Sequence, residues 1–129
     1  MSGTLQSTAD SGADQLRRRT KQFALPVIRM VESLPRGRAA DTIGGQLIRS
    51  GTSVGSNYRA ACRARSPAEF CAKLGIVEEE ADESVFWMEL LVEAGLIKQS
   101  RLADLLQEAN EIVAMVVASI KTARARRSR

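Results

Sequence analysis

Histidine is absent from this 129-residue sequence. Without imidazole, the chain lacks the commonest general base, the commonest zinc ligand and the base of every serine–histidine triad. This absence leaves carboxylate and lysine chemistry open. Long apolar runs are also missing: no stretch approaches the roughly 18 apolar residues that a membrane-spanning helix needs. We therefore expect no membrane association.

Aromatic residues make up only 4% of the chain, and there are two cysteines, Cys62 and Cys71. Aliphatic residues and alanine must build the core, which favours packed helices over a β-sandwich. Two thiols cannot complete a four-ligand zinc site by themselves. We expect both to be buried, reduced side chains of a cytoplasmic protein, with a disulfide across a helix–loop–helix corner as the alternative.

Apolar residues recur at three- and four-residue steps in four segments, which predicts four helices. The first covers about residues 14–34, and Pro26 should kink or interrupt it. The second covers about residues 41–64, although its centre at 50–57 is poor in helix-forming residues. We predict helix there as well, because the apolar stripe continues in phase and small residues let two helices approach closely.

The third predicted helix has the clearest ends. Ser66 and Glu69 form a capping box around Pro67, and Gly95 supplies the left-handed C-terminal cap. The fourth helix covers about residues 100–125. Short connections between long helices force antiparallel neighbours, so the predicted fold class is all-α, an antiparallel up-down-up-down four-helix bundle.

The predicted domain organisation is one bundle with two short tails. Residues 1–13 form a polar, disordered tail without the features of a signal peptide. Residues 14–126 form the bundle, and residues 127–129 form a basic tail. We see neither an internal repeat nor a second domain.

Two patterns resemble chemical sites but lack the partners such sites need. Gly51 to Gly55 reads G-x-S-x-G, yet a nucleophile elbow needs a preceding strand and a histidine. Glu78, Glu79, Glu80, Asp82 and Glu83 form a dense acidic run, yet a metal–carboxylate bundle would want Glu-x-x-His pairs. We interpret the run as a solvated face or as ion-pair partners for arginines of the second helix, with a specific acidic contact surface as the alternative. No catalytic, metal-binding or cofactor-binding residue is predicted.

Charge is unevenly distributed along the chain, and arginine dominates the basic residues. Residues 1–65 carry 11 Lys and Arg against 4 Asp and Glu, residues 66–111 carry 3 against 11, and residues 112–129 carry 5 against none. In an antiparallel bundle, the start of the first helix and the end of the fourth would share one basic end. Such clusters are the usual footprint of phosphate-backbone binding, and a solvated surface without a ligand is the alternative. The nucleic-acid-binding candidates are Arg17, Arg18, Arg19, Lys21, Arg49, Arg59, Arg63, Lys121, Arg124, Arg126 and Arg127.

Phe86 and Trp87 are adjacent to Met88, which lies on the apolar seam of the third helix. Three consecutive residues cannot share one helix face, so Phe86 or Trp87 must point elsewhere. A second apolar face on a long helix usually packs on another subunit. Phe86 and Trp87 are therefore candidates for an oligomer interface, with packing inside the chain as the alternative.

Several sequence blocks resemble one bacterial family, the four helix bundle proteins, also called the 23S rRNA intervening-sequence proteins. The blocks are residues 46–61, 66–70, 73–74, 80–84 and 87–91, within a match over about residues 16–120. The part from Ser53 to Arg59 is the most specific. The polar N-terminal segment and the Arg-rich C-terminus depart from the family pattern, so surfaces can differ from those of relatives.

The resemblance implies a left-handed bundle, a ring-like homopentamer and no enzymatic activity. Some members of the family are encoded inside insertions in large-subunit ribosomal RNA genes. A related branch, the accessory protein of diversity-generating retroelements, is a basic pentameric barrel that binds nucleic acid and a reverse transcriptase. Within this frame, Ser53 and Asn57 look like structural positions that satisfy neighbouring helix groups.

The sequence thus predicts a non-enzymatic, oligomeric module without cofactors that binds RNA or DNA through Arg-rich surfaces. The alternative is a protein–protein scaffold or an accessory subunit, for example of a reverse transcriptase, without RNA specificity of its own. In that case the acidic third helix or the exposed aromatic residues would dock the partner.

Overall fold

Helices account for nearly all of the part of the chain that the structure describes, residues 11–127 of a computed structural model. The helices are α2 (Gly12–Gln22), α3 (Ala24–Glu32), α4 (Arg38–Cys62), α5 (Pro67–Glu93) and α6 (Gln99–Arg127). Most of the predicted tails, residues 1–10 and 128–129, lie outside the described residues. Where the tails overlap the described part, residues 12–13 already belong to α2 and Arg127 belongs to α6.

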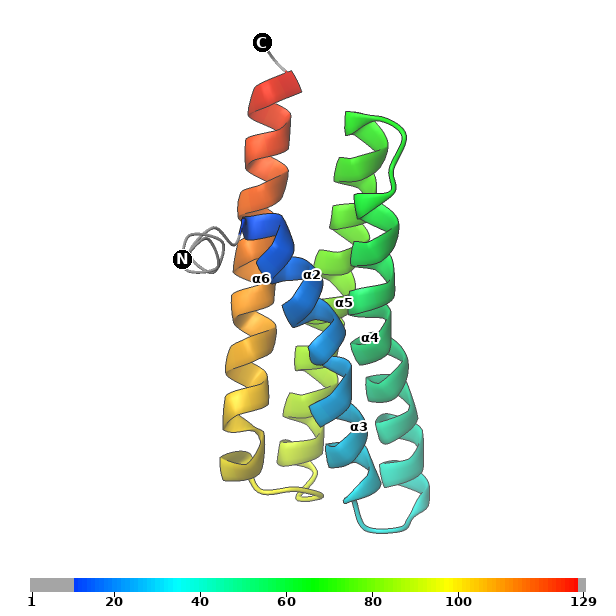
Figure 1. Cartoon of the computed structure of the whole chain (residues 1–129). Coiled ribbons are helices and arrows are strands. Elements are labelled where there is room, and N and C mark those ends of the chain that lie inside the picture. Colours follow the sequence, from blue (N-terminus) through cyan, green and yellow to red (C-terminus); the bar gives the residue numbers. More distant parts are fainter. Residues whose placement is uncertain (1–10, 128–129) are drawn as a thin grey trace, which may run out of the picture.

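The first predicted helix is interrupted, as Pro26 led us to expect. α2 and α3 meet at Phe23, three residues before Pro26. Proline has no backbone N–H, so it cannot donate to the carbonyl of Gln22 one turn earlier. Phe23 keeps right-handed helical dihedrals, with φ −55° and ψ −33°. The two segments therefore continue in nearly the same direction (Figure 1).

α4 runs unbroken through the stretch that helix propensity alone would make a loop, so the prediction of helix there is confirmed. It begins at Arg38, three residues earlier than expected. Gly51 and Gly55 face α3 and α2 closely. A Cβ on Gly51 would lie 2.9 Å from Val27 Cγ1, and one on Gly55 would lie 2.8 Å from the backbone oxygen of Thr20. Packing therefore stabilises a segment that its intrinsic propensity does not.

The ends of α5 also match the sequence prediction. The Ser66 hydroxyl accepts a hydrogen bond from the backbone N–H of Glu69 at 3.1 Å, and Pro67 occupies the first turn. Gly95 has φ +73°, the left-handed conformation that favours glycine at a helix end. A short turn then leads into α6.

The helices pack around one aliphatic core. α4 packs along α5 and α3, α6 packs along α5, and α2 contacts both α4 and α6. Figure 1 shows α2 and α3 in front of α5, with α4 and α6 on either side. The largest fully buried side chains are Phe23, Leu16, Leu47, Leu74, Met88, Leu91, Leu102, Ile112, Val27, Val54, Val77 and Val116. Among the described residues, no helix is both long and apolar enough to cross a membrane.

Two serines are completely buried where α4 packs against α5. The Oγ atoms of Ser50 and Ser84 lie 3.0 Å apart. Each hydroxyl also lies within hydrogen-bond distance of a carbonyl of its own helix, Leu47 at 3.3 Å and Glu80 at 2.9 Å. A polar pair whose bonds are satisfied inside the core fixes the register of the two helices without leaving a buried group unpaired.

One sequence expectation about the cysteines is wrong. Cys71 is buried, but Cys62 is exposed, and both are free thiols. Cys62 is the last residue of α4, where the chain leaves the core to turn toward α5.

Candidate nucleic-acid interface

A basic groove lies between α2 and the C-terminal half of α4, with a volume of about 660 Å³. Arg17 and Lys21 come from α2, and Arg59 and Arg63 from the end of α4. All four were predicted as nucleic-acid-binding candidates, and all four are exposed. The remaining residues that line this groove are small or polar: Ala24, Thr52, Gly55, Ser56, Tyr58 and Cys62. We call this surface the α2–α4 groove.

The small residues of α4 let α2 approach closely, so that basic residues of both helices line the same groove. The backbone of α2 at Thr20 and Lys21 lies directly over Gly55. Tyr58 lies beneath the groove with 2% of its surface exposed, and its hydroxyl donates to the carbonyl of Ala13 at 3.3 Å. Burial raises the pKa of Tyr58 well above its usual value, so the phenol stays neutral beneath the four cations.

Arg17 has one counter-charge within its own helix. Its Nη1 lies 2.9 Å from Oδ1 of Asp14, and both side chains are about half exposed. Hydrogen bonds from Ser11, then from Arg17, hold the pKa of Asp14 below its usual value. An exposed pair of this kind contributes little to stability, so phosphate can compete for Arg17.

Two predicted candidates instead take part in ion pairs between helices. Arg19 of α2 contacts the carboxylates of Glu108 and Glu111 of α6, both at 2.7 Å. The hydrogen bonds to Glu108 and then Glu111 raise the pKa of Arg19. We assign this residue to the packing of α2 on α6 and not to the candidate interface.

Arg49 of α4 pairs with two carboxylates of α5, Glu80 at 3.1 Å and Glu83 at a shorter distance. Ser53 also donates to Glu80, at 2.8 Å, and the Asn57 amide donates to the carbonyl of Ser53 at 2.9 Å. Part of the acidic run therefore does pair with an arginine of the second predicted helix. The prediction that Ser53 and Asn57 serve structural roles is confirmed, and Ser53 lies within a helix and not at an elbow.

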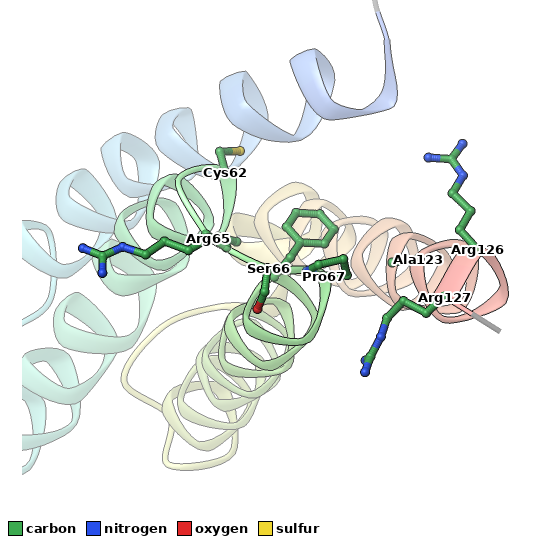
Figure 2. A pocket seen from close by; sticks show the side chains of 10 residues that line it. Cys62, Arg65, Ser66, Pro67, Ala123, Arg126 and Arg127 are labelled. Atoms are coloured by element: carbon green, nitrogen blue, oxygen red, sulfur yellow. The ribbon is translucent and has the colours of Figure 1, made fainter. Parts of the chain in front are cut away.

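Two basic residues of α6 line a second groove at one end of the bundle. Arg126 and Arg127 line a cavity of about 510 Å³ next to the start of α5, together with Arg65, Ser66 and Pro67. Figure 2 shows the two arginines on α6 and the serine and proline across from them. Arg65 was missed by the sequence reasoning, although it directly precedes the N-cap residue Ser66.

The start of α2 and the end of α6 lie toward the same end of the bundle, as expected, but their basic residues do not form one cluster. Consecutive residues of α2 point in different directions, since each is rotated by about 100° from the last. Arg17 and Lys21 line the α2–α4 groove, whereas Arg19 faces α6. α6 also extends past the start of α2 (Figure 1). Three candidates line neither groove, although their side chains are exposed: Arg18 on α2, and Lys121 and Arg124 on α6.

The two aromatic candidates for an oligomer interface differ in exposure. Phe86 is 53% exposed. Trp87 packs partly against the core, and its Nε1 donates to Glu83 at 2.9 Å. Their rings meet edge to face with centroids 4.9 Å apart. Within residues 11–127, no three His, Cys, Asp or Glu side chains are grouped so that they could hold a metal ion.

Comparisons with known proteins place this geometry among helical bundles. Residues 14–118 match the model of the 23S rRNA-intervening sequence protein family. A crystal structure of a protein of unknown function from the S23 ribosomal protein family of Bacteroides thetaiotaomicron superposes with a TM-score of 0.81. It is 29% identical, and the alignment covers 86% of this chain and 99% of that chain. No curated protein matches the chain.

Proposed function

Because the chain belongs to the 23S rRNA-intervening sequence protein family, we propose that it is a non-enzymatic, oligomeric module that binds nucleic acid through its basic surfaces. We further propose that the up-down-up-down bundle is the subunit of a ring-like homopentamer in the cytoplasm. The observation that carries the binding proposal is the α2–α4 groove, where two helices bring Arg17, Lys21, Arg59 and Arg63 to one surface.

The chemistry of the groove suits phosphate groups more than bases. Arginine binds phosphate oxygens bidentately, and Thr52 and Ser56 add hydroxyl groups to the same lining. Proteins that read unpaired bases stack them on exposed aromatic rings. The aromatic ring of this groove, Tyr58, is almost completely buried. We therefore expect contacts to the sugar–phosphate backbone with little sequence preference.

The salt dependence of binding tests this proposal quantitatively. Neutralising four phosphates gives a slope of about −3.6 for log K against log salt on duplex DNA. Affinity for a labelled 20-base-pair RNA or DNA duplex, followed by fluorescence anisotropy, should thus fall about a hundred-fold between 50 and 200 mM salt. Replacing both Arg59 and Arg63 with Ser should reduce the magnitude of the slope by about 2.

A matched control removes the same charge from the other end of the same helix. Arg38 is the first residue of α4 and Arg36 lies two residues before it; both are exposed, and Arg38 is about 38 Å along the helix from Arg63. Their replacement with Ser should leave the slope unchanged. If both double variants weaken duplex binding equally, only the net charge of the protein matters. If neither variant changes the affinity or the salt slope, the proposal that the α2–α4 groove binds nucleic acid is refuted. Replacing Arg126 and Arg127 with Ser asks separately whether the second groove contributes.

The alternative function, a protein scaffold, makes the opposite prediction about salt. Binding to a partner protein through apolar contacts would persist at 200 mM salt, where binding to the duplex is largely lost. An oligomer that ignores both duplexes at 50 mM salt would favour this alternative.

A further inference from the structure

The large apolar side chains that remain exposed gather on two helices. Within residues 11–127 they are Leu25 and Ile28 of α3, 52% and 39% exposed, and Ile76 and Phe86 of α5, 37% and 53% exposed. Single exposed apolar residues are ordinary. Here each pair lies on the outer side of its helix among charged residues of mostly one sign.

The outer face of α5 is acidic. Exposed residues follow one another at three- and four-residue steps along this helix and so form one stripe. Its members are Ile76, Glu79, Asp82, Phe86, Glu89 and Glu93. We call this surface the α5 stripe. It carries four acids and no base.

The outer face of α2 and α3 carries the opposite net charge. Phe23 keeps helical dihedrals, so the spacing of exposed residues continues from α2 into α3. The members are Arg18, Lys21, Leu25, Ile28, Arg29 and Glu32, all of them exposed, and Lys21 lies at the edge that this face shares with the α2–α4 groove. We call this surface the α2–α3 stripe. Three bases against one acid give it a net positive charge.

The two stripes lie on opposite sides of the bundle. α4 and α6 each pack against α5, and α2 packs against both α4 and α6, so α2 with α3 and α5 occupy diagonal corners. Figure 1 shows α2 and α3 in front and α5 behind. One molecule therefore presents an acidic face with two apolar residues at the back and a basic face with two apolar residues at the front.

We propose that the α5 stripe of one copy of this chain docks on the α2–α3 stripe of the next copy. A symmetric contact would place four acids against four acids, or bases against bases, and like charges that face each other across an interface are strongly unfavourable. A head-to-tail contact pairs opposite charges and covers all four apolar residues. Such a contact uses two different patches, so it closes into a ring if the rotation between copies allows it. This inference rests on the oligomeric part of the proposed function and not on nucleic-acid binding.

Charge reversal on each face tests the contact by size-exclusion chromatography with light scattering, without nucleic acid. The wild-type chain should give a multiple of the 14.0 kDa subunit mass. A variant with Glu79→Lys, Asp82→Lys and Glu89→Lys has two stripes of net positive charge, and one with Lys21→Glu and Arg29→Glu has two stripes of net negative charge. Each should shift to the 14.0 kDa monomer with its helical circular dichroism unchanged.

The chain that carries all five substitutions separates docking from misfolding. Its stripes are again opposite in charge, with the signs exchanged, so it should recover the wild-type mass. It should not form mixed oligomers with the wild-type chain, which an affinity tag on one of the two would detect. The groove variant with Arg59→Ser and Arg63→Ser should remain oligomeric even if duplex binding is lost.

Three outcomes would overturn the inference. They are a monomeric wild-type chain, single-stripe variants that keep the wild-type mass, and a chain with all five substitutions that stays monomeric. A monomeric wild-type chain would indicate that the stripes bind a different protein. Charge-reversed variants that keep the wild-type mass would place the subunit contact elsewhere.

Discussion

Adding one methyl group to Gly55 should shift α2 and destabilise the bundle, whereas the same change at Gly45 should stabilise it. Both glycines lie within α4, and Ala gains up to about 1 kcal/mol over Gly in a helix interior. A Cβ on Gly45 meets no atom within 4 Å. A Cβ on Gly55 would lie 2.8 Å from the oxygen of Thr20 and 3.0 Å from the Cα of Lys21.

The contacts at Gly55 are with backbone, which cannot rotate away. Carbon atoms prefer separations of roughly 3.5–4.0 Å, so α2 would have to shift by several tenths of an ångström. Overpacking of this kind typically costs about 1–3 kcal/mol. After the helix-propensity gain common to both sites, Gly55→Ala should be less stable than Gly45→Ala by about 1–3 kcal/mol in the free energy of unfolding.

Thermal and urea denaturation, followed by circular dichroism, measure this difference directly. In a domain of this size, each kcal/mol corresponds to about 4 °C in the midpoint of thermal unfolding. The two variants share the same substitution and the same helix, and Gly55 differs in lying against α2, so their difference reports mainly the contact with α2. If Gly55→Ala gains as much stability as Gly45→Ala, α2 does not lie as close to α4 as the structure places it.

Three further predictions concern the buried serines, an interhelical ion pair and the cysteines. Ser50→Ala and Ser84→Ala should each cost about 1 kcal/mol, and the double variant should cost less than their sum because each single variant already removes the hydrogen bond between the two hydroxyls; additive costs would show that the two do not interact. Glu111 has a lowered pKa, chiefly from Gln107 and then Arg19, so its stabilising effect is present above its usual value of 4.5 and is lost as pH falls below it. Acid titration of Arg19→Gln should therefore show a weaker loss of stability in that range than the wild-type chain, and identical curves would argue against the pair. A charged thiol reagent should modify exposed Cys62 in the native protein and buried Cys71 only after denaturation, and mass spectrometry of the two peptides would reveal the opposite order if their burial is wrong.

The fold was predictable from the sequence because local and global signals agree in it. Ser66, Pro67 and Gly95 mark the ends of α5, and Pro26 marks the break in the first helix through its missing N–H. The glycine- and serine-rich centre of α4 was harder, since only the phase of the apolar stripe argued against a loop. That phase prevailed because tertiary packing outweighs intrinsic propensity.

The candidate site was predictable in composition but not in geometry. Arg59 and Arg63 followed from their residue type, whereas Arg19 and Arg49 are equally basic and instead bind carboxylates of neighbouring helices. Which carboxylate an arginine meets depends on the rotation and the relative height of two packed helices. A sequence gives the spacing within one helix and not that rotation or height. The exposure of Cys62 was missed for the same reason, because it depends on where α4 leaves the core.

The break at Phe23 gives α2 a separate role in recognition. Two of the four cations of the α2–α4 groove belong to this eleven-residue segment, which buries only Leu16 and Thr20 of its own residues. The complete groove therefore exists only in molecules in which α2 is seated. The apparent affinity for a polyanion equals the intrinsic affinity multiplied by the fraction of such molecules. A bound duplex would in turn raise that fraction, so ligand binding and the docking of α2 are thermodynamically linked.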